Sequence, residues 1–215
     1  MNSYISNESN GERKSLTLDD ALKRIAEVQK YIDIVEVGTP MVIEYGMEPV
    51  RIIKKTYPNL EVLADLKIMD AGYYEAKEAF EAGADYITVL GVTDDLTIEG
   101  CVKAAKEYGK ETVVDMICVS DLEKRINRLE ELGVDYVSVH TGVDQQAAGV
   151  TPLDQCRQMM NCVKKTKVSV AGGINTDTIC LYKDLDPDIV IVGGGITHAA
   201  DPVSAAKTLH RVIRG

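Results

Sequence analysis

The sequence predicts an α/β protein of the (β/α)8 TIM-barrel class with parallel strands. Short apolar runs rich in β-branched residues recur along the chain, and stretches with helical spacing separate them. Alternation of this kind gives parallel strands joined by right-handed crossovers. Two closures compete, an open doubly wound sheet and an eight-stranded barrel. Seven regular units and one weak N-terminal unit favour the barrel.

The first expected unit is the atypical one. Residues 3–6 are its candidate strand, which is short and poorly apolar, within a polar N-terminal segment at residues 1–15. The clearest helices, with 3.6-residue spacing, are expected at residues 21–28 and 122–132, and Gly83 and Gly133 are expected to end helices just before strands. No linker interrupts the pattern, so residues 1–215 are predicted to form a single domain. The regular strands are expected at residues 32–36, 62–66, 86–90, 112–117, 136–140, 168–171 and 188–192.

The composition excludes several classes of function. The chain has a formal net charge of −10, which argues against nucleic acid as a partner, because phosphate backbones attract basic patches. No apolar run approaches the length that crosses a membrane, and residues 1–14 lack the apolar core of a signal peptide. The five cysteines are scattered and form no C-x-x-C pair, which favours a reducing compartment. We therefore expect a cytoplasmic protein with no membrane partner.

Charged residues stand at the carboxyl ends of several expected strands, where functional groups gather in such barrels. Asp65 and Lys67 are two residues apart, so on a strand they point to the same face. Glu36 ends the preceding strand, and Asp115 lies late in a later one. Two carboxylates from adjacent strands, together with substrate oxygens and water, suit Mg²⁺. The alternative is a structural network of ion pairs inside the barrel.

His140 ends the strand at residues 136–140 and is the candidate proton shuttle. A single histidine at a strand end is often only a hydrogen-bonded structural residue, but its position among carboxylates favours a catalytic role. His198 and His210 lie in helix-rich sequence and are expected to be structural.

Glycines follow the last two expected strands, as Gly172-Gly173 and Gly193-Gly194-Gly195. Glycine lets backbone N–H groups approach an anion closely, and barrels commonly bind phosphate after strands seven and eight. One such turn alone would be explained by tight chain reversal. Two turns at these two strand ends predict a phosphate site.

Five stretches carry a resemblance to a known family. They are VEVGTP (35–40), ADLKIMDAG (64–72), AGADYITVLG (82–91), VHTGVDQQAAG (139–149) and VAGGI (170–174). They resemble the 3-hexulose-6-phosphate synthases, of the orotidine-monophosphate decarboxylase superfamily, whose near relatives are the 3-keto-L-gulonate-6-phosphate decarboxylases. The likeness runs from about residue 17 to the end. The D-x-K-x-x-D motif marks the superfamily, and the run after His140 favours the synthases.

The resemblance implies a homodimer of (β/α)8 barrels that catalyses a Mg²⁺-dependent aldol reaction. Ribulose 5-phosphate would lose a proton at C1, and the resulting enediolate would attack formaldehyde to give arabino-3-hexulose 6-phosphate. The implied roles are these: Glu36 and Asp65 hold Mg²⁺, Lys67 lies beside the developing oxyanion, His140 is the acid and base at C1, Asp70 reaches the partner subunit's site, Asp115 holds substrate hydroxyls, and Gly173, Gly193 and Gly194 bind the phosphate.

Two features bear on the choice of reaction. The decarboxylases carry an Arg three residues after the histidine, where this chain has Val143, and a Glu where it has Asp115; both features fit the synthases.

The family normally opens with an apolar strand that ends in Leu-Asp, whereas here Asn7 would take the Asp position. The alternatives are a related sugar-phosphate decarboxylase or epimerase, or a non-catalytic barrel that binds sugar phosphate.

Overall fold

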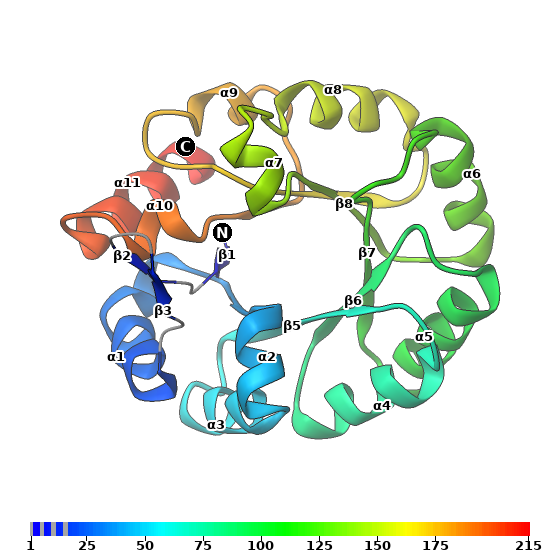
Figure 1. The fold of residues 1–215 in the computed structure, drawn as a ribbon, viewed down its shortest axis with the longest axis horizontal. Helices are drawn as coiled ribbons and strands as arrows, with labels where there is room; N and C mark the ends of the chain where they lie inside the picture. Colours follow the sequence, from blue (N-terminus) through cyan, green and yellow to red (C-terminus); the bar gives the residue numbers. More distant parts are fainter. Residues whose placement is uncertain (1, 5–6, 10–11, 15–16) are drawn as a thin grey trace.

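The computed structural model describes residues 2–4, 7–9, 12–14 and 17–215, with the side chains of residues 143 and 147 and those before residue 17 left undescribed. Helices surround a curled sheet of parallel strands (Figure 1). The strands are β1 (Asn2–Tyr4), β2 (Asn7–Ser9), β3 (Glu12–Lys14), β4 (Ile34–Val37), β5 (Glu61–Ile68), β6 (Tyr86–Leu90), β7 (Glu111–Asp115), β8 (Tyr136–His140), β9 (Lys167–Ala171) and β10 (Ile189–Ile191).

The helices lie outside the sheet and alternate with its strands. They are α1 (Leu18–Val28), the 3-10 turn η1 (Gln29–Tyr31), α2 (Thr39–Tyr45), α3 (Glu48–Thr56), α4 (Gly72–Ala82), α5 (Asp95–Tyr108), α6 (Leu122–Leu132), α7 (Val143–Ala147), α8 (Leu153–Cys162), α9 (Cys180–Lys183), α10 (Gly194–Thr197) and α11 (Pro202–Arg214).

The order of β4 to β10 in the sheet follows the chain, and every pair is parallel, as expected of repeated strand–helix units. All seven regular strands are confirmed within a few residues of their expected bounds. The helix expected at residues 122–132 is α6, and the one expected at 21–28 begins three residues earlier, at Leu18. Gly83 and Gly133 end α4 and α6 in the left-handed conformation, as expected for glycine at a helix end.

The N-terminal segment differs from the regular units. Residues Asn2–Tyr4 pair in parallel with β4, and Asn2 also pairs with Ile191 of β10. Half of the candidate strand at residues 3–6 lies outside the described residues. Asn7 does not extend β1 but begins β2, which forms an antiparallel hairpin with β3. The role of this segment as a complete first barrel strand stays a prediction.

Two apolar layers position the site. One lies between the strands and the surrounding helices and contains most of the buried aliphatic residues. The other fills the interior of the sheet with Ile34, Leu63, Tyr86, Val113, Tyr136, Ile189 and Ile191. Since side chains alternate along a strand, the residues two further on also point inward, one layer closer to the carboxyl ends. On β4 to β8 these residues are polar: Glu36, Asp65, Thr88, Asp115 and Ser138, all buried.

Among the described residues, no helix is long and apolar enough to cross a membrane.

Candidate active site

The polar layer forms the floor of a cavity of about 1220 Å³ at the carboxyl ends of the strands. Glu36, Asp65, Lys67, Asp115 and His140 all line it, so the structure brings together the charged residues that the sequence singled out. The predicted phosphate-binding glycines, Gly173, Gly193 and Gly194, line the same cavity.

Asp65 and Lys67 form an ion pair inside the cavity. Lys67 Nζ lies 2.8 Å from Asp65 Oδ1 and 3.2 Å from Asp115 Oδ2. Burial alone would lower the pKa of Lys67, but the carboxylates of Asp65 and Asp115 outweigh it and raise that pKa above its usual value. The side chain is therefore a permanent ammonium at neutral pH.

Two threonines that the sequence did not single out hold the carboxylate of Asp65. Thr39, at the start of α2, donates its hydroxyl to Asp65 Oδ2 over 2.7 Å, and Thr88 of β6 donates to Oδ1 over 2.8 Å. Both threonines lie in stretches that carry the family resemblance, residues 35–40 and 82–91, but no role was assigned to either. Thr88 also interrupts an apolar strand two residues after Tyr86, on the inward-facing side.

Lys67 has a left-handed backbone conformation, with φ of 50°. A non-glycine residue pays about 1–2 kcal/mol for it, since Cβ approaches the backbone. The strain coincides with a shift in the register between β5 and β6, where Ala64 pairs with Ile87 but Ile68 pairs with Val89. The prediction that Asp65 and Lys67 share a face is correct, but a bulge rather than a regular strand presents them.

Asp115 and His140 form the second part of the floor. His140 Nδ1 lies 2.7 Å from Asp115 Oδ2, and the backbone N–H of Ile117 donates to Oδ1 over 2.9 Å. Burial favours protonation of Asp115, but the His140 hydrogen bond and the charge of Lys67 hold its pKa below the usual range. An ionised Asp115 only accepts hydrogen bonds, so Nδ1 of His140 carries a proton, and in the neutral ring the lone pair is then on Nε2.

Glu36 is buried beside the other carboxylates and has no hydrogen bond to another described side chain. Burial, followed by repulsion from the Asp65 carboxylate, raises the pKa of Glu36 to about 8, and Lys67 only partly opposes this. The floor thus holds more negative charge than its single ammonium balances. A cation beside Glu36 and Asp65 would relieve this imbalance.

The glycine turns face this floor from β9 and β10. Gly172 and Gly173 both have positive φ, and a Cβ at Gly195 would lie 2.4 Å from the carbonyl oxygen of Ile174. Only glycine fits these close approaches of backbone to backbone. His198 lines the cavity beside Gly194, and its expected structural role stays a prediction. His210 lies elsewhere and packs its ring against Tyr31.

Asp70 is separate from these residues. It follows β5 in an exposed position, does not line the cavity, and accepts a hydrogen bond from the backbone of Ala71. Within the described part of the chain, Asp70 therefore lies away from the floor. Val143 begins α7, next to the cavity, and its side chain lies outside the described residues.

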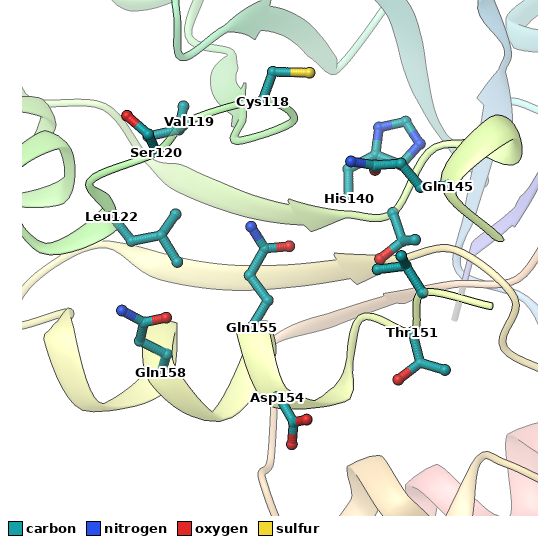
Figure 2. Close-up of a pocket in the computed structure, with 12 residues that line it drawn as sticks. Cys118, Val119, Ser120, Leu122, His140, Gln145, Thr151, Asp154, Gln155 and Gln158 are labelled. Atoms are coloured by element: carbon teal, nitrogen blue, oxygen red, sulfur yellow. The ribbon is translucent and has the colours of Figure 1, made fainter. Parts of the chain in front are cut away.

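A side pocket of about 390 Å³ adjoins the cavity at His140. Figure 2 shows Cys118 and Ser120 along one side, Gln155 and Gln158 of α8 along the other, and His140 at one end. Asp154 is the one acidic residue in its lining. His140 is the predicted catalytic residue that this pocket shares with the main cavity.

No group of three or more histidine, cysteine, aspartate or glutamate side chains among the described residues is arranged to hold a metal ion. A cation at this floor would therefore take two protein ligands at most from Glu36 and Asp65, and its other ligands from water or substrate. Mg²⁺ commonly binds proteins in this way.

A parallel barrel with an acid–lysine–histidine floor and glycine turns at its last two strands defines an enzyme of the class that acts on phosphorylated small molecules. The chain belongs to the orotidine 5'-phosphate decarboxylase/HUMPS family, whose model matches residues 15–209. The family fold is a TIM barrel, which agrees with the curled parallel sheet.

Individual relatives narrow the resemblance. The chain is 50% identical over 198 residues to the 3-hexulose-6-phosphate synthase of Bacillus subtilis, covering 92% of this chain and 94% of that protein. The crystal structure of the 3-hexulose-6-phosphate synthase of Salmonella typhimurium superposes with a TM-score of 0.91 at 52% identity, over 93% of this chain and 94% of that one. The Streptococcus mutans protein named KGPDC, crystallised as a complex, has a TM-score of 0.85 at 26% identity, over 92% of each chain. The prediction of an enzyme of the 3-hexulose-6-phosphate synthase type, a carbon–carbon lyase, is confirmed.

Proposed function

We propose that the enzyme joins formaldehyde to D-ribulose 5-phosphate and forms D-arabino-3-hexulose 6-phosphate. A base removes one proton from C1 of the sugar phosphate, which leaves an enediolate. The C1 carbon of the enediolate then forms a bond to the formaldehyde carbon, and the former aldehyde oxygen takes up one proton. The two substrates add without loss of any atom, and the same residues catalyse the reverse cleavage.

The observation that carries this proposal is the hydrogen bond between His140 and an ionised Asp115, 2.7 Å long. It leaves Nε2 of His140 free to take the proton from C1 and to return it to the aldehyde oxygen. A positioned histidine of this kind accelerates proton transfer by roughly 10²–10⁴-fold. Asp115 keeps the ring in the required tautomer and stabilises the imidazolium that forms.

Lys67 and the glycine turns support the same reaction. The Lys67 ammonium lies on the floor, 3.2 Å from Asp115, where it would stabilise the negative charge of the enediolate. Gly173, Gly193 and Gly194 would bind the phosphate with backbone N–H groups at the far side of the cavity. Whether Asp115 also holds substrate hydroxyls stays a prediction, since His140 and Lys67 already occupy its Oδ2 atom.

We also propose that the enzyme uses Mg²⁺, held by Glu36 and Asp65. The donor set fits a hard cation, because both side chains offer carboxylate oxygens and Glu36 has a raised pKa among like charges. Thr39 and Thr88 orient Asp65 from both sides. When bound, the ion would supply positive charge beside the substrate oxygens.

One incubation tests the proposal. The protein is mixed with ribulose 5-phosphate, Mg²⁺ and formaldehyde, and formaldehyde loss is followed together with C1–H exchange in deuterated water. Both are expected, and a chelator should suppress both. Exchange without formaldehyde loss would favour a decarboxylase or an epimerase. Neither exchange nor loss, in a protein that still binds the sugar phosphate, would favour the non-catalytic alternative.

We propose a homodimer in which Asp70 completes the partner's site. The support is an exposed apolar surface beside Asp70, which includes Met69 and Tyr74 at 55% and 64% exposure. Lys67→Ala and Asp70→Ala variants should each be inactive. Mixing them after dissociation should restore about a quarter of the activity, because half of the dimers are mixed and each has one intact site. No recovery in a verified mixed dimer would contradict a shared site.

Three further proposals concern the domain organisation, the closure of the sheet and the cellular location. Residues 1–215 form a single domain, and β1 closes the sheet as the eighth strand, supported by its pairing with β4 and β10. The enzyme acts in the cytoplasm, supported by five cysteines that are all free thiols. Deleting residues 1–15 tests the closure: the variant should lose stability, and an unchanged unfolding midpoint would contradict it.

A further inference from the structure

Thr88 lies at the centre of β6 and is almost fully buried, with 4% exposure. Its hydroxyl makes two hydrogen bonds to the neighbouring strand β5. It donates to Asp65 Oδ1 over 2.8 Å and accepts from the backbone N–H of Lys67 over 2.9 Å. One hydroxyl therefore connects the side chain of Asp65 to the backbone of Lys67.

The register between the strands explains why a side chain makes the second bond. From Ala64 to Ile68 β5 advances four residues, while its partner β6 advances only two, from Ile87 to Val89. The backbone of β6 offers too few acceptors opposite this bulge, so an N–H group in it lacks a regular ladder partner. The Thr88 hydroxyl replaces that missing acceptor.

The conformation of Lys67 depends on this replacement. Its left-handed φ of 50° is unfavourable for a lysine and persists only where surrounding contacts impose it. The same backbone sends its side chain to Asp65 and Asp115, with Nζ 2.8 Å and 3.2 Å away. Without the Thr88 acceptor, the backbone would relax toward negative φ and carry the ammonium away from both carboxylates.

We propose that Thr88 is a positioning residue for this enzyme: it holds the β5 bulge so that the Lys67 ammonium stands where negative charge develops in the substrate. The statement that negative charge develops in the substrate rests on the proposed function. The statement that Thr88 holds the conformation of Lys67 does not. Thr88 itself need not touch the substrate. Its effect belongs to the chemical step, because the glycines proposed to bind the phosphate follow β9 and β10, across the cavity.

Three variants separate positioning from general stability. Thr88→Val removes the hydroxyl and keeps the shape, while Thr88→Ser keeps the hydroxyl. Thr112→Val is the matched control, since Thr112 is also buried and donates to Asp135 Oδ2 over 2.9 Å, but lies near the amino end of β7, away from the cavity. Thr88→Ala replaces Thr88→Val if the latter does not fold.

The first measurement is steady-state kinetics with C1–H exchange in deuterated water. Thr88→Val should lower kcat and the exchange rate by about ten- to a hundredfold, as is typical of groups that orient catalytic residues. KM for ribulose 5-phosphate should stay near the wild-type value, Thr88→Ser should recover most of the turnover, and Thr112→Val should keep kcat. Unchanged kcat in Thr88→Val, or no recovery in Thr88→Ser, would overturn the proposal.

The second measurement does not depend on activity. Crystal structures of Thr88→Val and Thr88→Ser should show Lys67 leaving the left-handed region only in the valine variant, with its Nζ displaced from Asp65. If Lys67 keeps its conformation in Thr88→Val, Thr88 does not position it. If the wild-type enzyme neither exchanges C1–H nor consumes formaldehyde, the proposed function fails, and these structures still decide the role of Thr88.

Discussion

Asp115→Asn is the substitution that best separates the two roles open to Asp115. In the wild type, Ile117 N–H donates to Oδ1 over 2.9 Å, while Oδ2 accepts from His140 Nδ1 at 2.7 Å. In the variant, the amide oxygen should keep the Ile117 bond, which turns the NH₂ group toward His140. An NH₂ group can only donate, so the ring must accept at Nδ1 and carry its proton on Nε2. The base at Nε2 is then lost.

The size of the effect follows from this tautomer change. The same Asp-to-Asn exchange beside a catalytic histidine in serine proteases lowers turnover about 10⁴-fold. We expect kcat to fall by roughly 10²–10⁴-fold, or about 3–5 kcal/mol at 1.36 kcal/mol per factor of ten. KM for ribulose 5-phosphate should change little. If Asp115 mainly held substrate hydroxyls, KM would rise instead while kcat changed less.

The assay is formaldehyde consumption at saturating ribulose 5-phosphate, with C1–H exchange measured alongside. Asp135→Asn is the matched control, because Asp135 accepts from Thr112 N over 2.8 Å at the other end of the barrel. That variant should lose stability and keep kcat. A folded Asp115→Asn enzyme with kcat within tenfold of the wild type would refute the reasoning about the tautomer.

Three further outcomes are expected. His140→Ala should lower turnover by roughly 10²–10⁴-fold with KM for the sugar phosphate nearly unchanged; an unfolded variant by circular dichroism would instead indicate a structural role. Gly195→Ala should weaken inhibition by inorganic phosphate and raise KM, since its Cβ would lie 2.4 Å from a carbonyl oxygen; unchanged values would exclude tight packing there. Asp85→Asn should lower the free energy of unfolding at pH 7 by about 2–4 kcal/mol, because Lys54 and Lys110 lie 2.7 Å and 2.6 Å from its carboxylate. The folded-state pKa of Asp85 lies below 3.8, despite burial, so this stabilisation is present above pH 3.8 and disappears as pH falls through the folded value. Urea titrations of the wild type and Asp85→Asn, at pH 7 and at a pH below the folded-state pKa of Asp85, check this. An equal difference in the free energy of unfolding at the two pH values would contradict it.

The strands and the main cavity could be predicted because both depend on local patterns. Buried parallel strands appear as apolar runs, and each inward polar residue stands two positions after an inward apolar one, as Asp65 follows Leu63. Once the strands are parallel, their carboxyl ends must meet at one edge. Glu36, Asp65, Asp115 and His140 could therefore be assigned to one cavity without coordinates.

Other features depend on contacts between segments far apart in the chain. The hydroxyl of Thr39 reaches Asp65 across 26 residues of sequence, and α2 had to be placed before that contact could be recognised. His198 was expected to be structural because it lies in helix-rich sequence. It reaches the cavity because α10 begins at the glycine turn itself, at Gly194. The N-terminal strand could not be bounded, since its sequence lacks the apolar run that marks the others.

Lys67 shows why a correct pattern can still miss the mechanism. The spacing of two residues predicted that Asp65 and Lys67 share a face, and a regular strand would satisfy that prediction as well as the bulge does. The two arrangements differ in what holds the lysine: a regular strand would pair its N–H with backbone, whereas here the N–H depends on the hydroxyl of Thr88. A backbone carbonyl acceptor survives every substitution, proline included, and is lost only by a shift of register, but a hydroxyl is lost by one conservative change. The position of the Lys67 ammonium on β5 thus depends on Thr88 of β6. A residue of β6 that contacts no substrate can therefore alter the chemistry on β5.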